Sequence, residues 1–157
     1  MNVMTKKTIC LAAFLAALIC IAQPALAAGP NSVRWHSYAE GMALRKSMAK
    51  KVFINFYATW CGFCKRMDTK TFTDKAVIDY LEKNFIAVKV DVDKERNVAA
   101  QYNISPLPDT WFISETGDAI GNRPGFIGAD DLLPVLKFIH TESYLKMSYV
   151  QFLESQK

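Results

Sequence analysis

Two cysteines separated by two residues are the part of the sequence best suited to chemistry. Cys61 and Cys64 lie in the run Trp-Cys-Gly-Phe-Cys-Lys of residues 60–65. At the start of a helix, unpaired backbone amides and the positive end of the helix dipole stabilise a thiolate on the first cysteine. The second cysteine, one turn further along, can attack a mixed disulfide formed on the first and release the product. The spacing predicts a redox-active dithiol in which Cys61 is the nucleophile and Cys64 the resolving thiol.

Three other interpretations of this motif stay open from the residues alone. Half of a zinc site would need a second pair of ligands, for which the rest of the domain offers His36 and His140, both expected at the surface. A purely structural disulfide is the second interpretation, although so short a loop restrains little of the unfolded chain. The third is a motif without redox function in a binding protein. We expect neither a metal nor a cofactor.

Residues 1–27 have the pattern of a secretory signal peptide. Two lysines precede an uninterrupted apolar run at residues 9–21, and a triplet of mostly small residues ends at Ala27. We expect cleavage after Ala27, a periplasmic protein, and no stable membrane insertion, because the run is shorter than the roughly 20 residues of a spanning helix. A retained membrane anchor and a lipid anchor on Cys20 are the alternatives.

Cleavage would leave Cys61 and Cys64 as the only thiols, because it removes Cys10 and Cys20. Export would deliver this pair to a compartment where disulfides persist. The formal net charge of the whole chain is +4, and two of the lysines lie in the leader. So small a charge gives no indication of a nucleic-acid partner.

The remainder predicts one α/β domain at residues 35–141, after a tether at 28–34 and before a C-terminal helical extension at 142–157. The apolar and β-branched run at 52–57 predicts a central strand, buried on both faces, which leads directly into the cysteine motif. Periodicity and capping residues predict the other elements. We expect helices at 37–50, 61–70, 74–83, 94–102 and 130–140, and strands at 86–92, 110–113 and 119–123.

The segment from Asn55 to Lys65 resembles the strand-to-helix active site of the thioredoxin family. The segment from Tyr102 to Pro108 is similar to the family's segment that ends in a cis-proline, and the resemblance covers roughly residues 50–140. Residues 71–74, with the leader, are more similar to exported bacterial members, such as the C-terminal domain of the disulfide-reductant transporter. The resemblance implies a thioredoxin fold, with a central four- or five-stranded mixed sheet flanked by helices.

The resemblance also implies how client proteins bind. Pro108 would lie beside Cys61, and Leu107 would offer its backbone to an extended client peptide. Trp60 would shield the sulfur and supply an apolar contact. The implied partners are client proteins with disulfides or thiols, together with a membrane electron donor.

The implied function is a periplasmic thiol-disulfide oxidoreductase, acting as a reductase of protein disulfides. Gly62 and Phe63 bring no histidine between the cysteines, and a less stabilised thiolate makes a more reducing couple. The alternatives are a disulfide oxidase or isomerase, and a non-catalytic peptide-binding or chaperone-like module.

Two residues depart from the family pattern. Asn55 replaces a buried aspartate that is thought to take up the proton of the resolving thiol, so we expect slower resolution, aided by water, Lys65 or Glu82. Asp109 follows Pro108 where the family usually has threonine. A carboxylate that pointed inward would disfavour the thiolate, but we expect Asp109 to point outward into solvent. Asp91 and Asp93 are likewise expected to be solvated, at the end of a strand.

Overall fold

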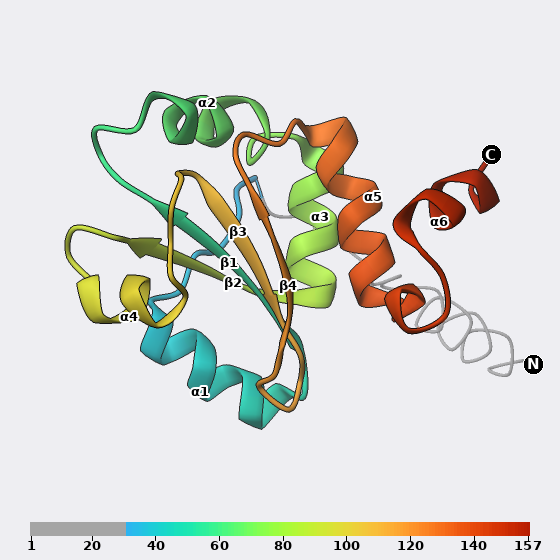
Figure 1. Ribbon diagram of the computed structural model, residues 1–157, viewed down its shortest axis with the longest axis horizontal. Helices are drawn as coiled ribbons and strands as arrows, with labels where there is room; N and C mark the ends of the chain where they lie inside the picture. The colour runs from blue at the N-terminus through green and yellow to red at the C-terminus, as the bar shows by residue number, and fades with distance from the viewer. Residues whose placement is uncertain (1–30) are drawn as a thin grey trace, which may run out of the picture.

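A computed structural model describes residues 31–157, which form a four-stranded mixed sheet with helices on both faces (Figure 1). The strand order is β2-β1-β3-β4. The strands are β1 (Lys51–Tyr57), β2 (Phe85–Asp91), β3 (Asp109–Ile113) and β4 (Ala119–Pro124). The helices are α1 (Tyr38–Met48), α2 (Gly62–Lys70), α3 (Lys75–Asn84), α4 (Arg96–Gln101), α5 (Ala129–His140), η1 (Ser143–Leu145) and α6 (Tyr149–Ser155). The predicted fold class, sheet and C-terminal helical extension are confirmed.

Strand β1 lies at the centre of the sheet, as its composition predicts. It pairs in parallel with β2 and antiparallel with β3. Its alternate side chains enter two cores: Ile54 and Phe56 pack with residues of α1 and α4, whereas Phe53 packs with residues of α3 and α5. With both edges hydrogen-bonded and both faces buried, the carboxyl end of β1 has a fixed position. The chain passes from there into the cysteine motif.

Helix α1 approaches the sheet closely through a glycine. The helix begins at Ser37, whose side chain forms a capping box with Glu40. One turn later, Gly41 lies against Val88 of β2, and a Cβ atom at Gly41 would overlap the Val88 side chain. The glycine is therefore required by packing, even though alanine is the better helix former.

Four charged residues hold the end of the sheet that is remote from the cysteines. Lys51, at the start of β1, is buried and bonds to Glu115 (2.6 Å) and to Glu142 (3.0 Å). Arg45 donates to the backbone carbonyl of Glu115 at 2.6 Å. Burial by itself lowers the pKa of Lys51, but the bonds to the two carboxylates outweigh it and raise that pKa above its usual value. This cluster joins β1, the β3–β4 turn and the start of the C-terminal extension.

The C-terminal extension packs on α5. Phe152 of α6 is buried against the Phe138 ring, with 5.3 Å between ring centroids. At the other end of the described chain, Val33 is already part of the core, so packing begins within the segment predicted to be a tether. None of the helices in residues 31–157 is long and apolar enough to cross a membrane. The predicted leader, its cleavage after Ala27, Cys10 and Cys20 lie outside the described residues.

Replacing Gly41 with alanine should destabilise the protein by about 1–3 kcal/mol, because the new methyl group overpacks the contact between α1 and β2. The matched control is Gly62→Ala in α2, where a Cβ atom meets nothing within 4 Å. That change should be neutral or stabilising by up to about 1 kcal/mol. Urea denaturation of the oxidised proteins measures both. Equal effects of the two substitutions would contradict the assigned packing of α1.

Candidate active site

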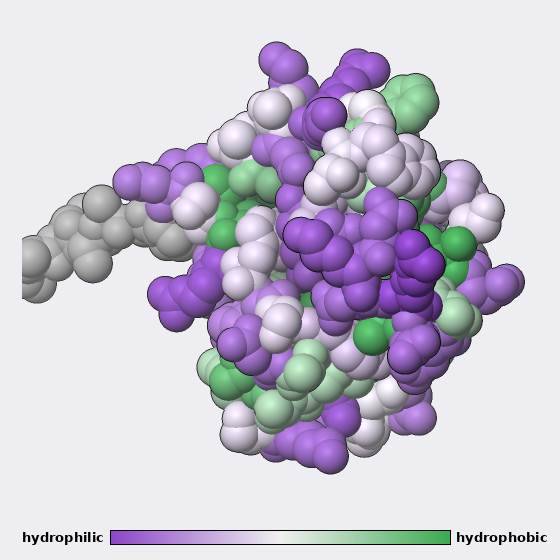
Figure 2. All heavy atoms as spheres, turned by 90° about the vertical axis from the view of Figure 1, so that its left-hand side faces the viewer, coloured by the Kyte–Doolittle hydropathy of each residue, from purple (hydrophilic) through white to green (hydrophobic). Residues whose placement is uncertain are grey.

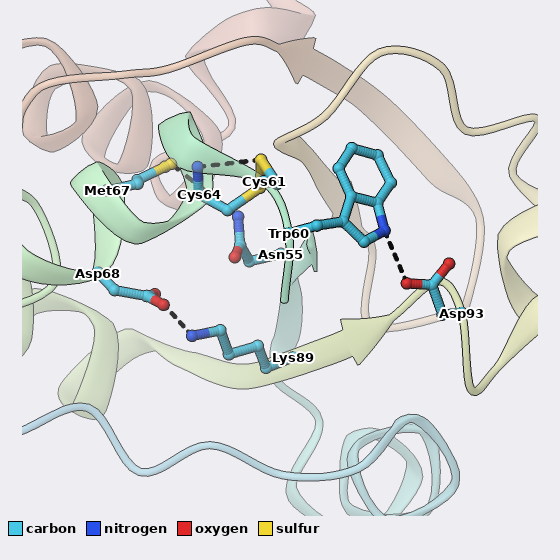
Figure 3. Close-up of a disulfide and its surroundings, with 8 residues drawn as sticks. All are labelled: Asn55, Trp60, Cys61, Cys64, Met67, Asp68, Lys89 and Asp93. Carbon is cyan, nitrogen blue, oxygen red and sulfur yellow. Dashed lines mark hydrogen bonds and ion pairs between the residues drawn. A yellow bond between two sulfur atoms is a disulfide. The ribbon is translucent and has the colours of Figure 1, made fainter. Parts of the chain in front are cut away.

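Cys61 and Cys64 form a disulfide at the start of α2, with 5.3 Å between their Cα atoms (Figure 3). Cys61 is the N-cap residue, and its sulfur accepts a hydrogen bond from the backbone amide of Cys64 at 3.1 Å. The exposed fractions of the two residues are 6% and 3%. The predicted helix start at this motif is confirmed. The amide that contacts Cys61 Sγ in the disulfide is placed to stabilise a thiolate on the same atom after reduction.

Leu107 is brought to the disulfide by the loop that precedes β3. Its side chain packs against the small cluster formed by Ala58, Cys61 and Cys64. The next residue, Pro108, is buried, and its carbonyl accepts from the Gly125 amide at 2.7 Å. The Leu107–Pro108 and Ser105–Pro106 peptide bonds are both cis. The structure therefore places the predicted client-binding segment at the cysteines, while the binding role itself stays a prediction.

Trp60 stands at the rim of the site and is held by an acid that sequence reasoning missed. Trp60 is 69% exposed, and its Nε1 donates to Asp93 Oδ2 at 2.8 Å. Figure 3 shows the indole turned toward Asp93, which follows the end of β2. Phe63, between the cysteines, is 61% exposed. The expectation of a solvated Asp91 is wrong, since that side chain is buried and accepts from the Asp93 amide at 3.1 Å.

Beneath the cysteine helix, Asn55 occupies a buried position. Its Nδ2 lies 4.0 Å from the sulfur of Met67. Across the sheet, Asn55 is in register with Lys89 of β2 and with Thr110 of β3. The Thr110 hydroxyl is buried and has no hydrogen-bond partner among residues 31–157. The described residues thus place a neutral polar pair, Asn55 and Thr110, at the level where a buried acid was expected from the family pattern.

Glu82 cannot help to deprotonate Cys64, so that prediction is wrong. Glu82 lies near the C-terminal end of α3, where its carboxylate accepts from the backbone amide of Arg34. The acid that α2 supplies is Asp68, one turn beyond Cys64, and it bonds to Lys89 at 2.6 Å (Figure 3). The i, i+4 spacing of Cys64 and Asp68 was a signal in the sequence that could have identified it.

The expectation of a solvated Asp109 is also wrong. Asp109 is 3% exposed, and it accepts hydrogen bonds from Trp111 Nε1 at 3.1 Å and from Asn122 Nδ2 at 3.0 and 3.1 Å. Burial raises the pKa of this carboxyl above its usual value, and the hydrogen bonds only partly offset the effect. As the first residue of β3, Asp109 pairs with Phe56, so its side chain lies on the face of the sheet that α1 and α4 cover.

The two histidines lie apart from the cysteines. His36 forms an isolated parallel bridge to Val88, and His140 is exposed beside the Tyr80 hydroxyl, 3.1 Å from its Nδ1. Within residues 31–157, no three side chains of histidine, cysteine, aspartate or glutamate gather in an arrangement that could hold a metal ion.

A family model for the thioredoxin-like domain matches residues 38–140, the part of the chain that contains both the sheet and the cysteines. The chain belongs to the thioredoxin-like family. With the Cys61–Cys64 pair at the family's helix start, it is a thioredoxin-like thiol-disulfide oxidoreductase.

Individual relatives agree with this assignment. A thioredoxin of Mycoplasmoides gallisepticum is 35% identical over 91 residues, which are 58% of this chain and 86% of that protein. The thiol:disulfide interchange protein DsbD of Campylobacter jejuni is 35% identical over 88 residues, but these are 54% of this chain and 15% of DsbD. Among solved structures, a thioredoxin from Thermus thermophilus has a TM-score of 0.62 at 27% identity, over 68% of this chain and 85% of that one.

The C-terminal domain of Neisseria meningitidis DsbD, in its oxidised form, shares the fold with a TM-score of 0.55 at 20% identity. The likeness covers 68% of this chain and 99% of that domain. The predicted resemblance to thioredoxins and to the C-terminal domain of the disulfide-reductant transporter is therefore confirmed.

Replacing Asn55 with aspartate should speed resolution of the mixed disulfide, because a carboxylate beneath Cys64 can accept the thiol proton. We expect a lifetime shorter by about tenfold near neutral pH, at a cost of about 1–3 kcal/mol in stability for the buried acid. Rapid-mixing kinetics with a peptide disulfide measures the lifetime. Asn55→Ser is the control, since it changes the same buried group without adding an acid, and it should give no acceleration. An unchanged lifetime in Asn55→Asp would contradict the assigned position of Asn55.

Proposed function

We propose that this protein is a periplasmic reductase of disulfides in other exported proteins. The observation that carries the proposal is the position of Cys61 at the N-cap of α2, with its sulfur on the Cys64 amide and Leu107 packed beside it. An attacking thiolate at Cys61 and the Leu107 backbone, which a client peptide could bind, then lie side by side. The leader pattern of residues 1–27 and the similarity to DsbD support export.

The proposed reaction begins with the dithiol form. The Cys61 thiolate attacks one sulfur of a client disulfide, and the other client sulfur leaves as a thiolate that takes up a proton. Cys64 then loses its proton and attacks Cys61 Sγ in the mixed disulfide, so the second client sulfur is released. The Cys61–Cys64 disulfide that remains must receive two electrons and two protons. A membrane donor is the proposed source.

The rim of the site suits brief contact with many clients. Trp60 and Phe63 offer exposed aromatic surface next to Cys61, and the bond to Asp93 fixes the Trp60 indole. Figure 2 shows the side of the molecule where α2 and α4 lie, and hydrophilic residues cover most of it, with small and scattered apolar areas. A contact limited to two aromatic rings and the Leu107 backbone supports a transient, exchange-type encounter.

The reducing direction is the first testable part of the proposal. With glycine and phenylalanine between the cysteines, the described residues add no charged donor there to stabilise the thiolate. We expect a reduction potential near or below about −220 mV, measured by equilibration with glutathione and mass-tagging of free thiols. A value near −120 mV would instead make the protein an oxidase or isomerase.

The order of the two cysteines is the second testable part. Cys64→Ser should accumulate mixed disulfides between Cys61 and client proteins, because no resolving thiol remains to release them. Cys61→Ser is the matched control and should trap none, since only Cys61 holds the N-cap position at which its sulfur accepts a backbone amide that can stabilise a thiolate. Non-reducing gels of exported proteins separate the two variants. Full function in the cell with both cysteines changed to serine would favour a non-catalytic binding or chaperone-like module.

A further inference from the structure

The carboxyl group of Asp109 is buried, next to the client segment of Leu107 and Pro108. Asp109 follows Pro108 directly, and it pairs with Phe56 near the carboxyl end of β1. Leu107, two residues earlier, packs on the cluster that contains both cysteines. The chain therefore connects Asp109 to the disulfide through one buried proline and one contact residue.

The groups that donate hydrogen bonds to the Asp109 carboxylate are neutral. Trp111 and Asn122 donate to its oxygens, and the backbone amide of Thr110 also contributes. None of the ion pairs found in residues 31–157 includes Asp109. By contrast, the exposed or half-buried carboxylates of Asp68, Glu115 and Glu142 each have a lysine partner.

The buried cation of α1, on the same face of the sheet as Asp109, is Arg45, which bonds to the Glu115 carbonyl beyond the far end of β3 and forms no ion pair with Asp109. Around Asp109, strand β1 contributes Phe56, and the chain after α4 contributes Tyr102, whose ring lies edge-on to Trp111 at 5.0 Å. Burial and a hydrogen bond to Tyr38 raise the pKa of Tyr102 well above its usual value, so that hydroxyl stays neutral. Arg123 of β4 is in register with Thr110, which places it on the opposite face of the sheet from Asp109.

We propose that the uncompensated charge of Asp109 disfavours the thiolate of Cys61 and so makes the Cys61–Cys64 pair more reducing. A negative charge that is buried and unpaired acts over a longer distance than one in water. Destabilising the thiolate raises the free energy of the reduced form, which then gives up its electrons more readily. The inference deepens the proposed reductase function and rests on it. Asp109 affects the reaction only through Cys61, by changing the stability of the Cys61 thiolate. It is therefore a positioning residue and not a catalytic one.

The coupling must be reciprocal. If the Asp109 carboxylate disfavours the Cys61 thiolate, the thiolate in turn disfavours the ionised carboxylate. The two charges coexist only at the higher pH where reduced Cys61 loses its proton, so the coupling is measured in the ionisation of Cys61. A residue that only holds the strand end has no reason to shift that ionisation.

The test replaces Asp109 with asparagine, which keeps the size and the accepting oxygen but removes the charge. Alkylation of Cys61 by iodoacetamide should show its midpoint at a lower pH than in the wild type. The equilibrium constant for reduction by glutathione should rise about three- to tenfold, where tenfold corresponds to about 30 mV. The control is Asn122→Ala, which removes the donor of two hydrogen bonds to Asp109 but leaves the charge. It should lower stability without moving the alkylation midpoint to lower pH.

Two results would overturn the proposal: no shift in Asp109→Asn, or the same shift in Asn122→Ala. If Asp109→Asn does not fold, Asp109→Thr, which also removes the charge, is measured in its place, and its alkylation midpoint should again lie at a lower pH than that of the wild type. An unchanged midpoint in that variant would refute the coupling. The difference between wild type and variant tests Asp109, whereas the absolute potential of the wild type tests the reductase function. Failure of one is therefore distinguishable from failure of the other.

Discussion

The central constraint on this molecule is that β1 is hydrogen-bonded on both edges and covered on both faces. A strand held in this way cannot shift its carboxyl end without breaking pairs with β2 and β3 and moving Phe53, Ile54 and Phe56 out of two cores. The turn from β1 into α2 therefore sets Cys61 at a fixed N-cap position. The same pairing sets the start of β3, and with it Leu107, at a fixed distance from the sulfur atoms.

The two ends of the sheet differ in how their buried charged groups are paired. At the end remote from the cysteines, Lys51 is buried but pairs with Glu115 and Glu142, so the charges are compensated and join three elements. At the cysteine end, the buried polar groups include the neutral Asn55, a Thr110 hydroxyl without a partner among residues 31–157, and an Asp109 carboxylate without a cation, while the buried Asp91 has Lys94 at 3.6 Å. Departures from complete polar satisfaction tend to lie at functional sites, where they are maintained by the rest of the fold.

The sequence was sufficient for the fold because the relevant signals are local and periodic. The apolar run of β1, the capping residue Ser37 and the apolar spacing of α3 and α5 each predict one element, and the ends differ by one or two residues. The cysteine pair was likewise readable, since its chemistry depends on spacing along one helix turn. The contacts of the acidic side chains could not be predicted from the sequence. Asp109 and Asp91 are polar residues that one expects at the surface, and their burial depends on how the strand ends pack, with partners that include Asn122 on the next strand for Asp109 and the amide of Asp93 for Asp91.

The cost of burying a charge also explains why Asn55 stands where the family pattern has an aspartate. An acid beneath Cys64 would lie next to Lys89, and that lysine is here engaged by Asp68 from above and by the Tyr57 ring, 4.7 Å from its Nζ. With this cation already compensated, a neutral amide at Asn55 avoids the cost of a second buried carboxylate. The buried acid that directly follows the client segment of Leu107 and Pro108 is Asp109, on the other face of the sheet from Asn55. The proton chemistry of Cys64 and the charge felt by Cys61 therefore come from different elements, which separates the rate of resolution from the reducing strength of the pair.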